Sequence, residues 1–197
     1  MVSSFTLCIF AYLMGSVSTA IIVCKIMGYP DPRSEGSNNP GATNVLRIGG
    51  KFPAILTLVG DVLKGVFAVM IGQWLEMTPY VLGLIGFSAF LGHLFPVYFN
   101  FEGGKGVATA LGVVTTLHWP LGASIIGLWF LVALIFRISS LAALVSWAAA
   151  PILAYFLCDQ YLLGVTAMTV LLIIRHKANI QGLINGTESR IGKKKSS

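Results

Sequence analysis

Charged residues are scarce in this sequence: aspartate, glutamate, lysine and arginine together fill 10% of its 197 positions. A soluble globular domain carries about 25% charged residues and is about half apolar. Here 56% of the residues are hydrophobic and the mean hydropathy is +0.84. The composition excludes an ordinary soluble domain and predicts an integral membrane protein. Because the length allows about six to eight spans of about 20 residues, the membrane bundle is expected to be nearly the whole protein.

Acidic residues and cysteines are fewer still, at seven and three. The carboxylates are dispersed and no His, Asp or Glu cluster has the spacing of metal ligands, so we expect no metal and no other cofactor. Cys8, Cys24 and Cys158 lie in apolar segments and are expected to be buried thiols. Neither a Ser-His-acid set nor a Cys-His set is visible, which argues against a covalent intermediate.

Seven apolar segments are candidates for membrane spans. Six of them are clear over a window of about 19 residues. The seventh, residues 106–118, would cover only about 20 Å of a hydrocarbon core of about 30 Å. It is either a short span or a re-entrant segment. The six clear spans are expected near residues 3–28, 53–75, 78–99, 119–136, 139–157 and 160–175.

The basic residues decide between these alternatives. If residues 106–118 cross the membrane, nearly all lysines and arginines share one face, whereas the opposite connections carry only Glu76 and Asp159. The positive-inside rule then places the N-terminus outside and the C-terminus in the cytoplasm. We therefore expect an all-α integral membrane protein in which residues 1–190 form one domain of seven transmembrane helices, with one short span after the GGKG turn. Residues 191–197 are expected to be a basic, disordered tail, and the first apolar run is expected to remain as an uncleaved span.

The unusual polar sequence then lies on the cytoplasmic face, in residues 31–47, 101–106 and 175–183. The first of these segments contains GSNNPGATN, which has no charge and no large apolar residue but many hydroxyl and amide donors. Glycine-rich backbones can present N–H groups to an anion, and Arg47, Lys105 and His176 would add positive charge. The GGKG turn lacks the spacing of a nucleotide-binding P-loop. The sequence therefore predicts a site for a polyol phosphate at the membrane surface.

Asp61, Lys64 and His93 are ionisable residues inside the predicted spans. Asp61 and Lys64 are three residues apart, so they share one helical face and are expected to form an ion pair, which could support the loop above it. His93 lies near the cytoplasmic end of the third span, close to the GGKG turn. It is either a structural hydrogen-bonding residue behind the site or a general base.

Long stretches of the chain resemble the bacterial membrane glycerol-3-phosphate acyltransferases that use acyl phosphate. The resemblance runs from GSVSTAIIVCK through DPRSEGSNNPGATNVLRIGGK, DVLKG and GHLFPVYFNFEGGKGVATALG to LLIIRHKANIQGLINGTE, and the GATN-x-x-R and GGKGVAT blocks are specific together. Two differences stand out: GSNNPG replaces the usual GSGN, and Glu102 stands where a lysine often precedes GGK.

The resemblance implies seven spans in the bacterial cytoplasmic (inner) membrane and an active site that faces the cytoplasm. It also implies transfer of a fatty acyl group from acyl phosphate to the 1-hydroxyl of glycerol 3-phosphate, which gives lysophosphatidate and phosphate at the first step of phospholipid synthesis. Expected partners are these two substrates and the lipid bilayer, with functional coupling to the soluble enzyme that forms acyl phosphate. No nucleic-acid partner is expected.

The resemblance also implies a set of site residues, from which residue type and position alone select only Arg47 and Lys105. The residues expected to act in catalysis are His93, Lys105 and Asn179. The attacking proton could pass to His93 or to a phosphate oxygen of the substrate. The residues expected to bind substrate are Ser37, Asn38, Asn39, Gly41, Ala42, Thr43, Asn44, Arg47, Gly103, Gly104, Lys105, His176, Asn179, Gly182 and Glu188.

A transporter of phosphate esters is the main alternative, because it too needs cations and many spans. Such transporters usually bind their substrate near the membrane midplane between internal repeats. This sequence shows no repeat, and its polar segments are expected at one surface, which favours an enzyme.

Overall fold

The computed structural model describes residues 3–191, and every regular element in that part of the chain is a helix. Apart from Ile191, the predicted tail at 191–197 lies outside the described residues. The elements are α1 (Ser4–Gly15), α2 (Thr19–Ile26), α3 (Ala42–Gly49), α4 (Lys51–Trp74), α5 (Pro79–Leu94), η1 (Val97–Phe99), α6 (Val107–Leu117), α7 (Trp119–Phe136), α8 (Ser139–Leu157), η2 (Asp159–Tyr161), α9 (Leu162–Arg175) and α10 (Lys177–Ile184).

Five of these helical segments are long and apolar enough to cross a membrane. A sixth joins them if residues 159–175 and α10, which are bent by 58° at a break, count as one span. Each of the six clear spans predicted above therefore has a helical counterpart. The short segment is α6, whose 11 residues rise about 16 Å, so its crossing of the membrane stays a prediction. The described part of the chain is all-helical, and its long apolar helices are those of a multi-pass integral membrane protein.

The first predicted span has its counterpart in residues 4–26, which form two helices and not one. α1 ends at Gly15 and α2 begins at Thr19. At the break, the carbonyl oxygen of Val17 accepts a hydrogen bond of 2.9 Å from the ammonium of Lys64 on α4. A backbone carbonyl freed inside a membrane needs such a donor, because no water is there to bind it. A hydropathy window misses the break because it averages the three residues between the helices with their apolar neighbours.

Small residues let the helices approach closely. A Cβ atom at Gly15 of α1 would collide with the carbonyl oxygen of Ala89 on α5, and one at Gly65 of α4 would collide with the carbonyl oxygen of Thr109 on α6. Such contacts are typical of helix pairs in membranes, where close packing replaces the hydrophobic effect as the source of attraction. These two close pairs hold α5 and α6, and with them the GGKG turn that joins them, against α1 and α4.

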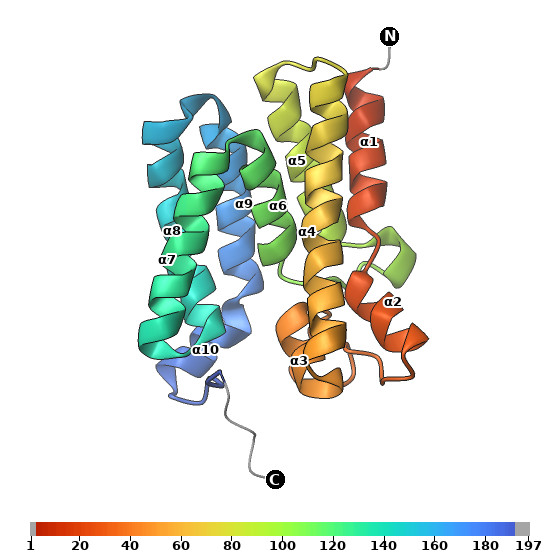
Figure 1. Cartoon of the computed structure of the whole chain (residues 1–197), viewed down its shortest axis with the longest axis vertical. Coiled ribbons are helices and arrows are strands. Elements are labelled where there is room, and N and C mark those ends of the chain that lie inside the picture. Colours follow the sequence, from red (N-terminus) through yellow and green to blue (C-terminus); the bar gives the residue numbers. More distant parts are fainter. Residues whose placement is uncertain (1–2, 192–197) are drawn as a thin grey trace.

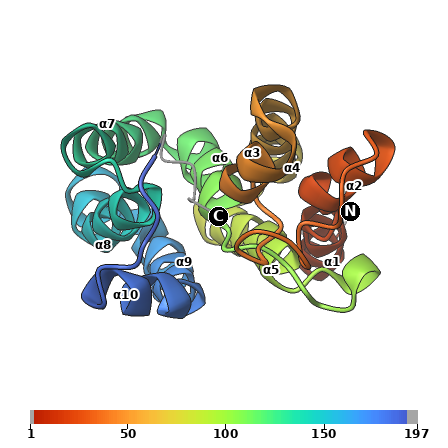
Figure 2. The ribbon, with the colours of Figure 1, turned by 90° about the horizontal axis from the view of Figure 1, so that it is seen from below.

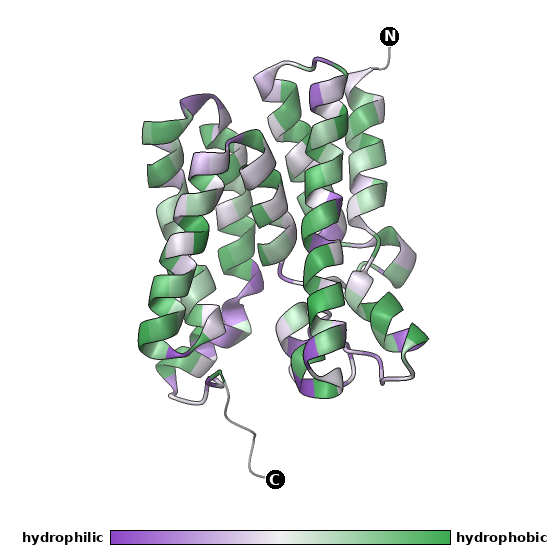
Figure 3. Cartoon of the chain, in the orientation of Figure 1, coloured by the Kyte–Doolittle hydropathy of each residue, from purple (hydrophilic) through white to green (hydrophobic). Residues whose placement is uncertain are grey.

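The outer surface of the bundle is as apolar as its core. Trp74, Leu134 and Phe156 are 81%, 79% and 77% exposed, while Trp147 and Phe90 are fully buried inside. Helices that are apolar on every side suit a hydrocarbon solvent. Figure 3 shows hydrophobic colour over most of the ribbon, with hydrophilic colour most extensive at one end, a patch part-way along α4 and smaller patches at the opposite end.

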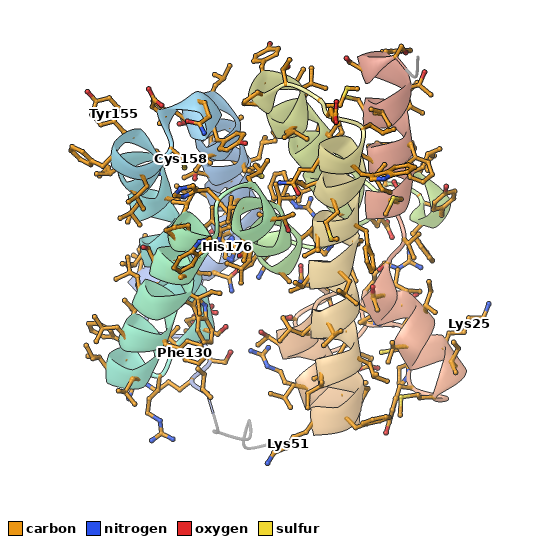
Figure 4. The ribbon with its side chains drawn as sticks, turned by 45° about the horizontal axis from the view of Figure 1, so that its top comes forward. Lys25, Lys51, Phe130, Tyr155, Cys158 and His176 are labelled. Carbon is orange, nitrogen blue, oxygen red and sulfur yellow. The ribbon has the colours of Figure 1, made fainter. Side chains whose placement is uncertain are left out.

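That hydrophilic end is formed by α3, α10 and the loop of residues 31–41, and we call it the polar end (Figure 1). Seen from this end, α7 to α10 form one group and α1 to α5 another, with α6 between them (Figure 2). Lys51 projects outward at the polar end and Lys25 projects outward from α2, whereas Tyr155 and Cys158 lie near the opposite end (Figure 4). The link from η1 to α6 runs part-way along α4, so the GGKG turn is recessed from the polar end (Figure 1).

Candidate active site

The loop before α3 is shaped by one buried amide. Asn44 is 1% exposed, and its side-chain oxygen accepts a hydrogen bond of 2.9 Å from the backbone N–H of Ser37. Its amide nitrogen donates to the carbonyl oxygens of Pro32 and Glu35, both at 2.9 Å. The functional groups of Asn44 are therefore engaged within the loop, which leaves the exposed residues Ser37, Asn38 and Thr43 at its surface.

Arg33 joins this loop to the segment that follows α5. Its guanidinium donates to the carboxylates of Asp31 and Glu102 at 2.7 and 3.2 Å, and to the carbonyl oxygen of Phe99 at 3.3 Å. The hydrogen bonds from Arg33 lower the pKa of the Asp31 carboxyl below its usual value. The acidic residue at position 102 thus has a structural partner, and the two polar segments are tied together.

The Gly103–Gly104 turn is held between the ends of α5 and α9. The backbone N–H of Gly104 donates to the carbonyl oxygen of His93 at 3.2 Å. Arg175 donates to the carbonyl oxygens of Gly103 and Gly104 at 2.7 and 3.2 Å, and its guanidinium stacks over the ring of Phe95. Both glycines are buried and neither position has room for a Cβ atom. Close backbone approach therefore requires glycine at both positions.

Lys105, directly after this turn, begins a chain of polar contacts to the C-terminal segment. Its ammonium donates to the side-chain oxygen of Asn179 on α10. The Asn179 amide nitrogen donates to the Glu188 carboxylate at 2.7 Å, and the hydroxyl of Ser140 on α8 donates to the same carboxylate oxygen at 2.7 Å. A Cβ atom at Gly182 would lie 2.8 Å from the other Glu188 oxygen. Residues from α8, α10 and the GGKG turn thus meet at one place.

The segment after α10 also reaches the opposite side of the site. The hydroxyl of Ser189 lies 2.6 Å from the guanidinium of Arg47 on α3, 142 positions away in the chain. The backbone N–H of Ile191 donates to the carbonyl oxygen of Arg137 at the end of α7. Figure 2 shows this segment running from α10 back across the end of α8. It links α3 to the other group of helices.

The two histidines of the predicted site are both buried. His176 is 2% exposed, and its Nδ1 lies 2.8 Å from the carbonyl oxygen of Leu172, so Nδ1 must carry the proton. Figure 4 shows His176 in the interior of the bundle. His93 is 7% exposed, with its Nδ1 3.5 Å from a carboxylate oxygen of Asp61. Neither ring is freely exposed to solvent.

Positive charge exceeds negative charge around Lys105. Burial lowers the pKa of Lys105 below the ordinary lysine value; Glu188 raises it in part, whereas Arg47 and Arg175 lower it further. Two further cations, Arg47 and Arg175, and one carboxylate, Glu188, therefore act on the Lys105 ammonium. Cations crowded in this way repel one another, and a bound anion relieves that repulsion. The arrangement is suited to binding an anionic group.

The structure brings most of the predicted site residues to this region from separate segments. Sequence reasoning missed the contacts of Arg175, Ser140 and Ser189. Arg175 carried a signal, because it is the first residue of the polar segment RHKANIQGL. The two serines carried none, since a serine near a helix start or in a tail is common on any protein surface.

Comparison with known proteins identifies the family of the chain. Residues 5–186 match the sequence model of the family described as glycerol-3-phosphate acyltransferase. The chain belongs to this family. A glycerol-3-phosphate acyltransferase of Methylococcus capsulatus is 51% identical over 188 residues, covering 94% of this chain and 95% of the relative. One of Vibrio cholerae is 47% identical over 186 residues, covering 94% and 89%.

Two solved structures share the fold. Both are crystal structures of PlsY (YgiH), an integral membrane glycerol 3-phosphate acyltransferase, one in a glycerol 3-phosphate form and one in a lysophosphatidic acid form. Their TM-scores are 0.92 and 0.90 at 36% identity, covering 97% of this chain and 96% of theirs. The family assignment makes this chain an acyltransferase enzyme of the membrane, as the sequence motifs predicted.

Proposed function

We propose that this enzyme transfers a fatty acyl group from acyl phosphate to the 1-hydroxyl of glycerol 3-phosphate, giving lysophosphatidate and inorganic phosphate. The observation that carries the proposal is the excess of cations around Lys105, with Arg47 and Arg175 near one carboxylate, Glu188. Both substrates carry a phosphate group, and two neighbouring phosphates repel each other unless cations and N–H donors lie between them. The forms named for the two PlsY structures are consistent with the acceptor and the product.

Acyl phosphate suits an enzyme that has no obvious nucleophile. It is a mixed anhydride with a good leaving group, so the enzyme can work by holding two substrates together. Proximity and orientation can contribute about 7–11 kcal/mol. The substrate hydroxyl oxygen bonds to the acyl carbon, the bond from that carbon to the phosphate oxygen breaks, and phosphate leaves. Lys105 and Arg47 would balance the phosphate charge while backbone N–H groups of the Gly103–Gly104 turn or the 36–44 loop stabilise the carbonyl oxygen.

The hydroxyl proton must go to an acceptor in this step. The two candidates are His93 and an oxygen of the departing phosphate. We favour the phosphate oxygen, because Nδ1 of His93 faces Asp61 and its Nε2 side is packed against Gly104. The proton then leaves with the product phosphate and the reaction balances without a base from the protein. In this proposal Lys105 and Asn179 are the catalytic residues, and His93 supports the turn.

In this proposal the remaining residues either bind substrate or shape the site. Ser37, Asn38, Asn39 and Thr43 offer donors at the loop surface, while Gly41, Ala42 and Asn44 form the start of α3. His176 and Gly182 pack the site from α9 and α10, and Glu188 holds Asn179 in place.

The same proposal includes the orientation of the protein. With α6 as a short span, the chain crosses the inner membrane seven times, with its N-terminus outside and its C-terminus in the cytoplasm. The polar end, where the lysines and arginines gather, would then face the cytoplasm. Acyl phosphate formed by a soluble enzyme could be delivered there, with its chain lying among the apolar helices.

The test is incubation of the purified protein with acyl phosphate and radiolabelled glycerol 3-phosphate. Acyl-CoA and acyl carrier protein thioesters serve as competing donors. We expect labelled lysophosphatidate with acyl phosphate alone. Equal or greater product from a thioester, or none from acyl phosphate, would refute the proposed donor.

A further inference from the structure

Three ionisable side chains form a cluster inside the bundle, apart from the cations of the proposed active site. Asp61 and Lys64 lie on α4 and His93 lies on α5, and they are 2%, 7% and 7% exposed. One carboxylate oxygen of Asp61 is 3.0 Å from the Lys64 ammonium and 3.5 Å from Nδ1 of His93. We call these three residues the α4–α5 cluster. It accounts for the hydrophilic patch part-way along α4 in Figure 3.

Burying such a cluster inside a membrane bundle costs free energy. Removing charges from water carries a penalty that an ion pair only partly repays, and apolar residues of the same volume often serve stability as well or better. Ionisable residues inside membrane spans are therefore most often functional. One part of the cluster has a visible task, since Lys64 donates to the carbonyl oxygen of Val17 at the break between α1 and α2. The task of Asp61 and His93 is not explained by that bond.

His93 contacts the turn that carries Lys105. The carbonyl oxygen of His93 accepts the N–H of Gly104, and a Cβ atom at Gly103 would collide with the same carbonyl oxygen. A Cβ atom at Gly104 would collide with Nε2 of the His93 ring and lie 3.1 Å from the carbonyl oxygen of Pro40. The ring thus lies beneath the place where the GGKG turn meets the loop before α3.

We propose that the α4–α5 cluster is a positioning device that fixes the Gly103–Gly104 turn and thereby the Lys105 ammonium. Asp61 holds the imidazole by its Nδ1 side, Lys64 holds Asp61 and the broken first span, and the ring and carbonyl of His93 support the turn. The consequence for catalysis rests on the proposed function, in which Lys105 contacts phosphate. The support of the turn itself does not rest on it.

The position of the cluster agrees with a positioning role. A side chain that binds substrate needs an accessible functional group, whereas the Asp61 carboxylate is buried in an ion pair with Lys64, and the Lys64 ammonium also donates to a backbone carbonyl. A displacement of about 1 Å of a catalytic group can lower the rate about 100-fold. Loss of the imidazole would leave room for the turn to shift by such an amount.

The experiment uses the full chain, purified in lipid nanodiscs, with the substitutions His93→Gln and Asp61→Asn. For each variant we would measure kcat and KM with acyl phosphate and glycerol 3-phosphate, amide hydrogen exchange of residues 103–105, and the unfolding temperature. We expect His93→Gln to lower kcat about 10- to 100-fold and to speed exchange at Gly104, while the unfolding temperature changes little. Asp61→Asn should act in the same direction, and the two effects together should be less than multiplicative because both act through one ring.

Thr57→Val is the matched control. Thr57 is fully buried on α4, one turn before Asp61, and its hydroxyl has no hydrogen-bond partner among the described residues. It should leave both kcat and the exchange at Gly104 unchanged.

The outcomes separate the alternatives. A lower unfolding temperature with full kcat for the folded fraction would show a merely structural role and overturn the proposal. A large loss of kcat with unchanged exchange at Gly104 would make His93 an acid–base group and overturn it too. If His93→Gln does not fold, Asp61→Asn, which keeps the side-chain volume, carries the same test. If the unaltered protein is inactive with acyl phosphate, the proposed function fails, but the exchange at Gly104 still decides whether the cluster supports the turn.

Discussion

Two polar clusters a short way apart in this protein differ in how their charges are balanced. The α4–α5 cluster pairs Asp61 with Lys64 and His93, so its carboxylate is matched from within. The cluster around Lys105 sets three cations against Glu188 alone. A balanced cluster needs no ligand, whereas a cluster with excess positive charge gains stability when an anion binds. The difference supports the proposals above, in which the first cluster holds the fold and the second binds substrate.

The clusters also differ in the elements that build them. The α4–α5 cluster comes from two consecutive membrane helices that pack directly on each other. The Lys105 cluster comes from α3, the end of α9, α10, the GGKG turn and the segment after α10. An arrangement of many separate segments can adapt to a ligand, whereas two packed helices give a rigid base. The Gly103–Gly104 turn joins the two clusters, so changes around it should show how far they are independent.

The largest effect should come from Lys105→Ala. Loss of this cation removes the charge that would balance a substrate phosphate beside the Gly103–Gly104 turn, and we expect kcat to fall about 100- to 1,000-fold while the protein stays folded in the membrane. Activity with radiolabelled glycerol 3-phosphate measures it. Lys177→Ala, at an exposed lysine of α10, is the control and should stay active. Near-normal activity of Lys105→Ala would remove the charge argument for this cluster.

Gly104→Ala should have the next largest effect, because its Cβ would collide with the His93 ring and force the two clusters apart. We expect kcat to fall about 10- to 100-fold. Gly127→Ala on α7 is matched to it, since a Cβ there meets nothing within 4 Å. If Gly104→Ala kept full activity, as Gly127→Ala should, then the position of the turn against His93 would not matter for the Lys105 cluster.

The sequence alone predicts the α4–α5 cluster better than the Lys105 cluster. Asp61 and Lys64 are three residues apart on one helix, so helical periodicity pairs them without any tertiary information. Arg47 and Lys105 were found because a cation beside a glycine-rich turn is a recognisable pattern. The Arg47–Ser189 contact joins residues 142 positions apart and has no such local signal.

In the fold too, the sequence predicts local features and misses those that depend on contacts between distant residues. Apolar length predicts each long helix, since burial in hydrocarbon is decided locally. The break at residues 16–18 depends on Lys64, a donor from another helix, so it could not be predicted from the first span itself. The engagement of Asn44 within its own loop likewise follows from backbone geometry that composition does not reveal.

Glu188→Gln should change the pH dependence of kcat/KM through the Lys105 cluster. Glu188 raises the pKa of Lys105, so its removal should lower that pKa further. Because Lys105 must be protonated, activity is lost as pH rises through its pKa, and the alkaline limb of kcat/KM should move to lower pH. We expect about a tenfold loss of rate at neutral pH through the loosened Asn179 as well. Glu35→Gln, which removes an exposed carboxylate, is the control; an alkaline limb that stays in place or moves upward would contradict the prediction.

Ser189→Ala should have the smallest effect. It tests how firmly Ser189 holds Arg47 in the Lys105 cluster. The hydrogen bond from Arg47 to this hydroxyl is worth about 1 kcal/mol, so KM for glycerol 3-phosphate should change no more than about fivefold. Ser124→Ala, whose hydroxyl bonds within α7, controls for loss of a helix-side hydroxyl. A small effect means that Arg47 is held loosely and is free to turn to a phosphate. A change of about 100-fold in KM would instead mean that Arg47 is held as firmly as the Asp61–Lys64 pair of the α4–α5 cluster.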